Sequence, residues 1–437
     1  MSYTEKKEIG QGSFAKVILV TDEEGKEYAK KVFLPHPNLI KNIGKEHLTK
    51  RFIREVKYQS SINHRNIVEI TDTFLQDTPP YFIMPLAECT LKDEMNEDHT
   101  LGENLKVVLF DILAGLEVIH ESGFIHRDLK PANILKFNND GDIKYAISDF
   151  GLITSNHSES STLTGTNAGG GTENYAAPEL NGGFKRANFA ADIYSFGAIL
   201  HDIFGQKVTR IPYTELNLSG EIGKIISKCT KRLPIKRYSS VAELREELYS
   251  VLNTDKIKFN SSNEEEVVNL LTDKTILNDE EWDKFFIFID DCMNTKISCD
   301  NVYKSITAEH IKSLQDSPEL FNALGYNFCQ YIKDGTFDFD YCDILAIKAE
   351  LFYEGNDLGL KADVAIALLE LGTSHNRWYV ERKYMTMVNK NISDILANRI
   401  KLELEIQEVN FKYKMSHIEG SIGVSKDTLH HILLDLL

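Results

Sequence analysis

Apolar residues in the first ninety positions of the chain fall into short runs separated by turn residues. The runs at 9–20 and 26–33 are typical of the two strands of a β-hairpin, and those at 66–75 and 80–87 of two further strands. Between them, residues 46–62 carry apolar side chains with the spacing of one helical face. The pattern predicts an N-terminal region of strands accompanied by one helix.

Helical periods dominate later in the chain. Residues 104–122 have the polar start and glycine stop of a helix, and a hairpin is predicted around Asp140 and Gly141. After a polar linker beyond Thr254, helical segments are predicted at 263–272, 280–293, 307–333, 342–354 and 361–372. Residues 400–415 alternate apolar and polar residues like a strand, although their Leu, Glu and Lys content favours a helix. The helical hairpins of 342–398 suggest a solenoid, but no signature spacing recurs.

Length and composition indicate a soluble globular protein of two or three domains. The chain has 437 residues, of which 42% are hydrophobic and 26% charged. It contains no apolar run of eighteen residues and no apolar signal core at its N-terminus, so we expect a cytoplasmic protein without a membrane segment. The six cysteines form no C-x-x-C pair, which argues against a zinc site or a disulfide framework.

Negative charge is concentrated in the C-terminal part. Lys and Arg number 30 against 34 Asp and Glu in residues 1–254, but 19 against 32 in residues 255–437. Such an acidic tail repels nucleic acid and anionic membranes. Residues 422–433 resemble the turn and recognition helix of a helix-turn-helix, yet this charge and Gly420 argue against DNA binding. A terminal packing helix capped by Ser425 is the favoured interpretation.

Residues 125–135, I-H-R-D-L-K-P-A-N-I-L, carry three side chains suited to phosphoryl transfer. Asp128 would accept the proton of an attacking hydroxyl, Asn133 would hold a divalent metal, and Lys130 would stabilise the charge on the transferred phosphoryl group. Taken singly, such residues in a polar loop are usually turn or capping residues. The run, however, resembles the catalytic loop H-R-D-x-x-x-x-N of the eukaryotic-type (Hanks-type) serine/threonine protein kinases without a gap.

Further kinase motifs follow in the family's order over roughly residues 5–252, so the resemblance covers more than half of the chain. It implies an α+β, bilobal protein-kinase fold, with an antiparallel sheet plus one helix in an N-lobe and a helical C-lobe. A mostly α-helical domain of unknown role would follow. The implied boundaries are 1–254 for the catalytic domain, divided into 1–87 and 88–254, and 255–437 for the C-terminal domain.

The resemblance also implies an ATP site. Gly10, Gly12 and Val17 match the glycine-rich loop G-x-G-x-x-G-x-V, with Ala15 in place of the third glycine. Lys31, two positions after Ala29, matches the lysine that holds the α- and β-phosphates, and strand alternation also favours it over Lys30. The remaining residues matched to nucleotide or metal binding are Ile9, Ala29, Glu55 as the partner of Lys31, Met84, Leu86, and Asp149 of the D-F-G motif. Asn133 and Asp149 would bind Mg²⁺.

Residues 152–176 are rich in Ser, Thr, Gly and Asn and match the kinase activation segment. Thr172 would lie near the substrate hydroxyl, and a phosphate on this segment would pair with Arg127. Beyond it, Asp192 opens a helix that would support the catalytic loop, and Arg237 would pair with Glu179. The residues open to phosphorylation are Ser160, Ser161, Thr162, Thr164 and Thr166.

We therefore expect an active ATP-dependent serine/threonine protein kinase with a regulatory or substrate-recruiting C-terminal domain. The lysine two residues after Asp128 favours serine and threonine acceptors. ATP, Mg²⁺ and protein substrates are the expected ligands, with a homodimer as one arrangement for autophosphorylation in trans, and no nucleic acid or membrane. The alternative is a pseudokinase scaffold that binds nucleotide without efficient transfer, although only the third glycine of the loop departs from the family pattern.

Overall fold

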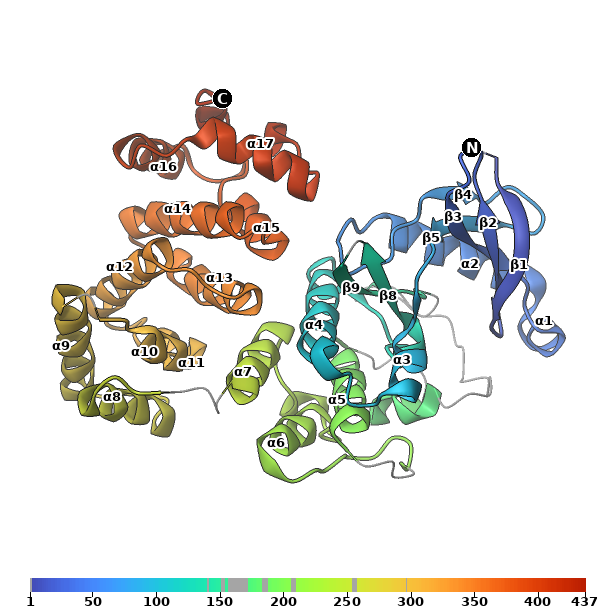
Figure 1. Ribbon diagram of the computed structural model, residues 1–437, viewed down its shortest axis with the longest axis horizontal. Helices are drawn as coiled ribbons and strands as arrows, with labels where there is room; N and C mark the ends of the chain where they lie inside the picture. Colours follow the sequence, from blue (N-terminus) through green and yellow to red (C-terminus); the bar gives the residue numbers. More distant parts are fainter. Residues whose placement is uncertain are drawn as a thin grey trace. The chain divides into compact units, whose positions relative to one another are not determined.

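The computed structural model describes residues 2–139, 141–150, 154–155, 172–182, 188–205, 210–253, 258–295 and 297–437. The chain divides into two compact units, Met1–Leu244 and Arg245–Leu437, which are described separately (Figure 1). Within the described ranges, no helix combines the length and the apolar character needed to cross a bilayer.

The N-terminal unit begins with a five-stranded antiparallel sheet in the order β1-β2-β3-β5-β4. Its strands are β1 (Thr4–Gln11), β2 (Ala15–Thr21), β3 (Glu27–Phe33), β4 (Asp72–Phe74) and β5 (Tyr81–Pro85). The strand predicted at 66–75 is only partly confirmed. Residues 66–68 leave this sheet because they form backbone hydrogen bonds with Ile147 instead. The Ile147 N–H donates to the Asn66 carbonyl, and the Val68 N–H donates to the Ile147 carbonyl.

Helix α2 (Lys45–Ser60) packs on this sheet, as its apolar spacing predicts. Leu48, Phe52 and Val56 are buried on one helix face, and the Phe52 ring lies 5.4 Å from Phe33 and 5.8 Å from Phe82 of the sheet. Truncating a buried phenylalanine of this kind costs about 3–5 kcal/mol. The core of this lobe therefore fixes where α2 lies relative to β3. A short helix that the pattern did not predict, α1 (Pro37–Ile43), precedes α2.

The rest of the N-terminal unit is mainly helical, which confirms the α+β, bilobal fold. Two of its helices, α4 (Leu105–Glu121) and α5 (Ala190–Phe204), are buried on nearly all sides. The predicted hairpin around Gly141 is also present, as β8 (Ile134–Asn139) and β9 (Asp142–Ile147). The remaining strands and α-helices are α3 (Leu91–Glu97), β6 (Cys89–Thr90), β7 (Phe124–Ile125), β10 (Thr154–Ser155), α6 (Gly220–Cys229) and α7 (Val241–Asn253). The boundary between the two units falls within the sequence of α7.

The described part of the C-terminal unit is helical. After α8 (Ser262–Asp273), α9 (Asp279–Thr295), α10 (Asp300–Ser305) and α11 (Ala308–Ser313), three helix pairs stack in succession (Figure 1). The pairs are α12 (Pro318–Asp334) with α13 (Phe339–Tyr353), α14 (Leu358–Ser374) with α15 (Trp378–Met387), and α16 (Asp394–Ile406) with α17 (Phe411–Ile422). The central helix α14 contacts all five others and is almost wholly buried, as in a solenoid.

Two sequence interpretations are settled here. The helix predicted at 307–333 is wrong as a single element, because the chain turns at 314–317 and restarts at Pro318. The ambiguous segment 400–415 contains no strand: it comprises the end of α16, a turn at 407–410 and the start of α17. Its alternating apolar residues divide by helical period, since Ile400 and Leu404 are buried while Leu402 and Ile406 are exposed.

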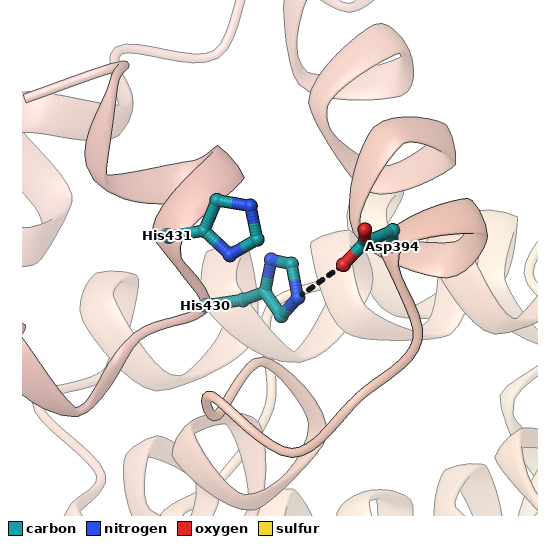
Figure 2. A group of neighbouring side chains, drawn as sticks. All are labelled: Asp394, His430 and His431. Atoms are coloured by element: carbon teal, nitrogen blue, oxygen red, sulfur yellow. Dashed lines mark ion pairs between the residues drawn. The ribbon is translucent and has the colours of Figure 1, made fainter.

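The C-terminal end of the chain is tied to α16 through the His430 side chain (Figure 2). Ser425 caps a three-residue 3₁₀ turn, Lys426–Thr428, and the following α18 (His431–Leu434) has only four residues, so the predicted terminal packing helix is much shorter than expected. Neither is long enough to serve as a recognition helix.

His430, His431 and Asp394 place potential metal-ligand atoms within 4.8 Å of one another. The Nδ1 atom of His430 accepts the Ile432 N–H at 3.3 Å, so its Nε2 atom carries the proton and donates to Asp394 at 3.2 Å. Metal binding at Nε2 would require the opposite tautomer. The hydrogen bonds therefore describe a structural tie between the last helix and α16.

Candidate active site

The predicted catalytic side chains of the 125–135 loop lie together. Lys130 Nζ is 2.7 Å from Asp128 Oδ2, and the Asn133 amide donates to the same oxygen at 3.1 Å and to the Asp128 carbonyl at 2.9 Å. The other carboxylate oxygen, Oδ1, is buried and receives no hydrogen bond from the described residues. Burial raises the pKa of Asp128 above its ordinary value, and the charge of Lys130 opposes this only in part. One oxygen is thus held in place by Lys130 and Asn133, while the other is an acceptor that the described residues leave unused.

A buried aspartate of α5 shapes this loop. Asp192 accepts the backbone N–H groups of His126 at 2.9 Å and Arg127 at 2.8 Å, and the His120 ring at 2.9 Å. Arg127 has a φ of 68°, a conformation that costs about 1–3 kcal/mol and persists only where surrounding contacts impose it. Burial raises the pKa of Asp192, but the His120 hydrogen bond and nearby charges outweigh it, so the net pKa is lowered and the carboxylate stays ionised. The predicted support of the loop by this helix is confirmed.

Lys31 is paired as its position on β3 predicts. Its Nζ atom lies 2.6 Å from Glu55 Oε1 on α2 and 3.6 Å from Asp149 Oδ1, whereas Lys30 points to the other face and pairs with Glu5. Burial lowers the pKa of Lys31, but the charges of Asp149 and Glu55 outweigh it and leave the pKa above its ordinary value. The lysine is therefore a fixed positive charge between two carboxylates.

Asp149 and Asn133, the predicted metal ligands, are joined through Ser148. The Ser148 N–H and hydroxyl both donate to the Asn133 carbonyl, at 2.8 and 3.0 Å. Phe150 is buried with its ring against His126, at 5.4 Å and nearly edge-on, and this contact anchors the segment next to the catalytic loop. Burial raises the pKa of Asp149, but the charges of Lys31 and Lys130 outweigh this effect and leave the pKa below its ordinary value. The carboxylate is therefore ionised and suited to a hard cation. Gly151 lies outside the described residues.

The glycine-rich turn joins β1 to β2. Gly10 and Val17 are partners in the strand register, and the Gly12 N–H closes the turn on the Ala15 carbonyl at 2.8 Å. Ala15, the departure from the family pattern, is buried in the core of the sheet, where its methyl group fills space. Ile9 is 43% exposed next to this turn.

Apart from Ile9, the apolar residues matched to nucleotide binding belong to a single hydrophobic cluster. Ala29 and Met84, partners on neighbouring strands, are buried in it, and Val17 and Leu86 pack against it. Among the cluster's other residues is Ala146, and its strand partner Leu135 packs against the cluster. The sequence interpretation selected neither for nucleotide binding, and the apolar character of Leu135, two positions after Asn133, is the only signal that the sequence offers for it.

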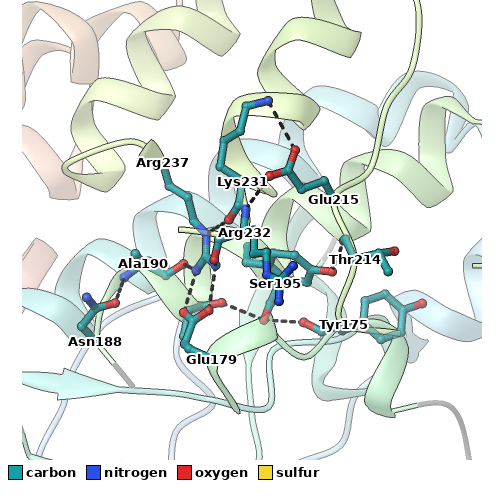
Figure 3. A network of polar contacts seen from close by, with 12 residues as sticks. Tyr175, Glu179, Asn188, Ala190, Ser195, Thr214, Glu215, Lys231, Arg232 and Arg237 are labelled. Atoms are coloured by element: carbon teal, nitrogen blue, oxygen red, sulfur yellow. Dashed lines mark hydrogen bonds and ion pairs between the residues drawn. The ribbon is translucent and has the colours of Figure 1, made fainter. Parts of the chain in front are cut away.

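A buried ion pair fixes the segment after the activation region (Figure 3). Arg237 donates to both carboxylate oxygens of Glu179 at 2.7 Å each, and also to the carbonyls of Ala190 and Lys231 at 2.8 Å. Ser195 donates to the Tyr175 carbonyl at 2.9 Å. Losing one partner of such a buried pair costs about 3–5 kcal/mol. The predicted architectural role of Arg237 is supported.

Residues predicted to be phosphorylated lie outside the described part of the chain. This applies to Ser160, Ser161, Thr162, Thr164 and Thr166, while Thr172 is described only in its backbone. Their assignment remains a prediction.

The comparisons with known proteins agree with this geometry. Residues 3–272 match the family model of the protein kinase domain. The chain is 31% identical over 205 residues to the probable serine/threonine-protein kinase zyg-1 of Caenorhabditis briggsae, covering 46% of this chain and 26% of that protein. It is 28% identical over 226 residues to the serine/threonine-protein kinase PknB of Mycolicibacterium smegmatis (46% and 36%), and 33% identical over 208 residues to the serine/threonine kinase NLK of Caenorhabditis elegans (46% and 31%). The matched region thus spans about a quarter to a third of these relatives.

Proposed function

The chain belongs to the protein kinase family, of the Hanks serine/threonine type, and we propose that it is an active enzyme that transfers the γ-phosphate of ATP to serine and threonine hydroxyls of proteins. The observation that carries this proposal is the pairing of Lys31 with Glu55 at 2.6 Å and its approach to Asp149 at 3.6 Å. This arrangement joins the sheet, α2 and the D-F-G motif around one cation, as phosphate binding requires.

The residues of the catalytic loop have separate roles in this proposal. The acceptor hydroxyl would donate its proton to Oδ1 of Asp128, which is the oxygen without a hydrogen bond from the described residues. Lys130, held 2.7 Å from the other oxygen, would stabilise negative charge on the phosphoryl group as it moves. The new O–P bond forms on the acceptor oxygen while the bond to the leaving ADP oxygen breaks.

Magnesium fits the residues predicted to hold it. The Asn133 amide nitrogen is used in hydrogen bonds to Asp128, which directs the amide oxygen away from them, and Asp149 is ionised. Two oxygen donors of this kind are the ligands that Mg²⁺ prefers. When bound, the ion would neutralise charge on the nucleotide phosphates.

The apolar cluster around Ala29 and Met84 would hold the base of ATP, with Ile9, Val17 and Leu86 beside it and the amides of Gly10 and Gly12 near the phosphates. The proposal assigns catalysis to residues 1–254 and a regulatory or substrate-recruiting role to 255–437. It includes autophosphorylation of the activation segment, in trans within a transient homodimer, and a cytoplasmic location. Six free cysteines accord with a reducing compartment.

A pseudokinase scaffold is the second candidate. Ala15 is the departure that favoured it, but this residue is buried in the core and the turn still closes through Gly12. The alternative is therefore less well supported than transfer.

The test is transfer of labelled γ-phosphate from ATP and Mg²⁺ by the full chain, to itself and to a generic basic protein, compared with Asp128→Asn. We expect label on serine and threonine with the original chain, and a loss of about 10²–10⁴-fold in the variant with ATP affinity retained. Equal labelling by both would overturn the role of Asp128. Nucleotide binding without labelling by either would favour the scaffold.

A further inference from the structure

Arg51 of α2 lies beside the glycine-rich turn. Its guanidinium carbon is 4.7 Å from the centre of the Phe14 ring, within the range of a cation–π contact. Arg51 precedes Glu55 by four residues, so both side chains project from the same helix face. One face of α2 therefore carries the partner of Lys31 and a contact to the tip of the turn.

The backbone of the turn is also anchored, but on another side. The Leu34 N–H donates to the Phe14 carbonyl at 3.0 Å, and the His36 N–H donates to the Ser13 carbonyl at 2.9 Å. Both donors follow β3, so these bonds fix the turn to the sheet. The Phe14 ring packs against the hydrophobic cluster of the lobe, and its contact with Arg51 extends this anchoring to α2.

Arg51 interacts electrostatically with the carboxylates of the candidate active site. Burial lowers the pKa of Arg51, while Glu55, Asp149 and Asp128 act in the opposite direction. A guanidinium stays protonated under all physiological conditions. The Phe14 ring thus contacts a permanent cation, and this cation interacts electrostatically with Asp149, the proposed metal ligand, and with Asp128, the proposed proton acceptor.

We propose that Arg51 is a positioning residue that couples the glycine-rich turn to α2, so that the turn is held in its nucleotide-binding position when Glu55 is paired with Lys31. A displacement of α2 that separates Glu55 from Lys31 would also withdraw Arg51 from Phe14. Loss of the ion pair and loosening of the turn are then one event. The inference rests on the proposed function, because it assigns Arg51 a role in binding the ATP used for transfer.

The test measures Mg²⁺-ATP affinity by fluorescence competition and then the KM and kcat of transfer, all with the full chain. We expect Arg51→Met to weaken ATP affinity and raise KM roughly 3- to 10-fold, with kcat changed less than about twofold. Arg51→Lys, which keeps a cation, should recover part of the loss. Lys50→Met is the matched control, since it removes one charge from the same helix at an exposed position, where Lys50 pairs with the exposed Glu46.

A double-mutant cycle with Phe14→Leu shows whether the contact itself is responsible. We expect each single variant to weaken ATP binding and the double variant to weaken it no more than the larger single effect. Additive effects, or an Arg51→Met chain that binds ATP as Lys50→Met does, would overturn the proposal. Thermal unfolding of each variant shows whether a loss of ATP affinity is caused by misfolding. If Arg51→Met is misfolded, the ATP affinities of Arg51→Lys and Phe14→Leu test the proposal in its place. Because ATP affinity needs no transfer, an original chain that binds ATP without transferring phosphate would contradict the proposed function but still test this coupling.

Discussion

In the N-terminal unit, charged side chains from separate elements converge on one place, whereas in the C-terminal unit they pair locally between neighbouring helices. Glu55, Asp128 and Asp192 come from two helices and a loop and all act on the catalytic loop or Lys31. In the helical unit, Asp343 and Glu381 are both almost completely buried, each with 1% of its surface exposed, and they belong to separate networks.

Those two networks have the features of structural interactions that hold packed helices together. Asp343 binds Arg377 through both oxygens at 2.7 Å and lies 3.8 Å from the buried Arg245. Glu381 of α15 accepts hydrogen bonds from His417 and Ser421 of α17. Each oxygen of these two carboxylates accepts a hydrogen bond from a neighbouring side chain. Buried charge thus indicates function only where the geometry leaves a group available to a ligand.

The largest test of this contrast compares two adjacent lysines of β3. We expect Lys31→Met to reduce phosphate transfer by about 10²–10³-fold, because it removes the cation held between Glu55 and Asp149. Lys30→Met should change transfer less than about twofold, since its ion pair with the exposed Glu5 contributes only about 0.2–1 kcal/mol to stability. Steady-state kinetics and thermal unfolding measure both effects. A similar loss of transfer in the two variants would mean that transfer depends on positive charge anywhere on β3, and not on the face of the sheet to which the lysine points.

A variant of the helical unit should show the opposite signature. Asp343→Asn removes the charge shared by Arg245 and Arg377, and we expect it to lower the free energy of unfolding by about 3–5 kcal/mol. At a temperature where the variant is folded, its ATP affinity should match that of the original chain. Denaturant unfolding and nucleotide titration separate these quantities. Unchanged stability would contradict the packing role of this network.

A smaller effect concerns pH. Because the pKa of Asp128 is raised and the proton acceptor must be ionised, kcat/KM should fall on acidification at a pH above about 3.9, the ordinary aspartate value. Lys130 opposes the rise in the pKa of Asp128, so Lys130→Met should move this acidic limb to higher pH. The pH–rate profiles of both chains provide the measurement, with circular dichroism to confirm folding. A limb that stays in place in the variant would show that another group governs it.

Part of the candidate site could be predicted because its residues are close in sequence. Asp128, Lys130 and Asn133 share one loop, so their spacing alone indicates that they meet. Lys31 was separated from Lys30 by strand alternation, which is also a local property. Glu55 required the family resemblance, since a helix of this composition carries several glutamates and its period does not select one.

Other features depended on contacts between distant residues. The segment at 66–68 has strand-like composition, but it pairs with Ile147 and not with the sheet. Arg51 had no distinguishing motif, and only the packing of α2 against the turn brings it to Phe14. Leu135 was missed because an apolar residue at a strand start has many possible partners.

The sequence by itself determined the family, the order of the elements in the N-terminal unit and the chemistry of the catalytic loop, because motifs and periods are encoded in neighbouring residues. Only the tertiary structure decided that residues 400–415 form the end of one helix and the start of another, that Ala15 fills the core, and that Arg51 contacts the glycine-rich turn. In each case the outcome depends on which surfaces exclude water from one another. Burial is a property of the packed chain, and no local pattern specifies it.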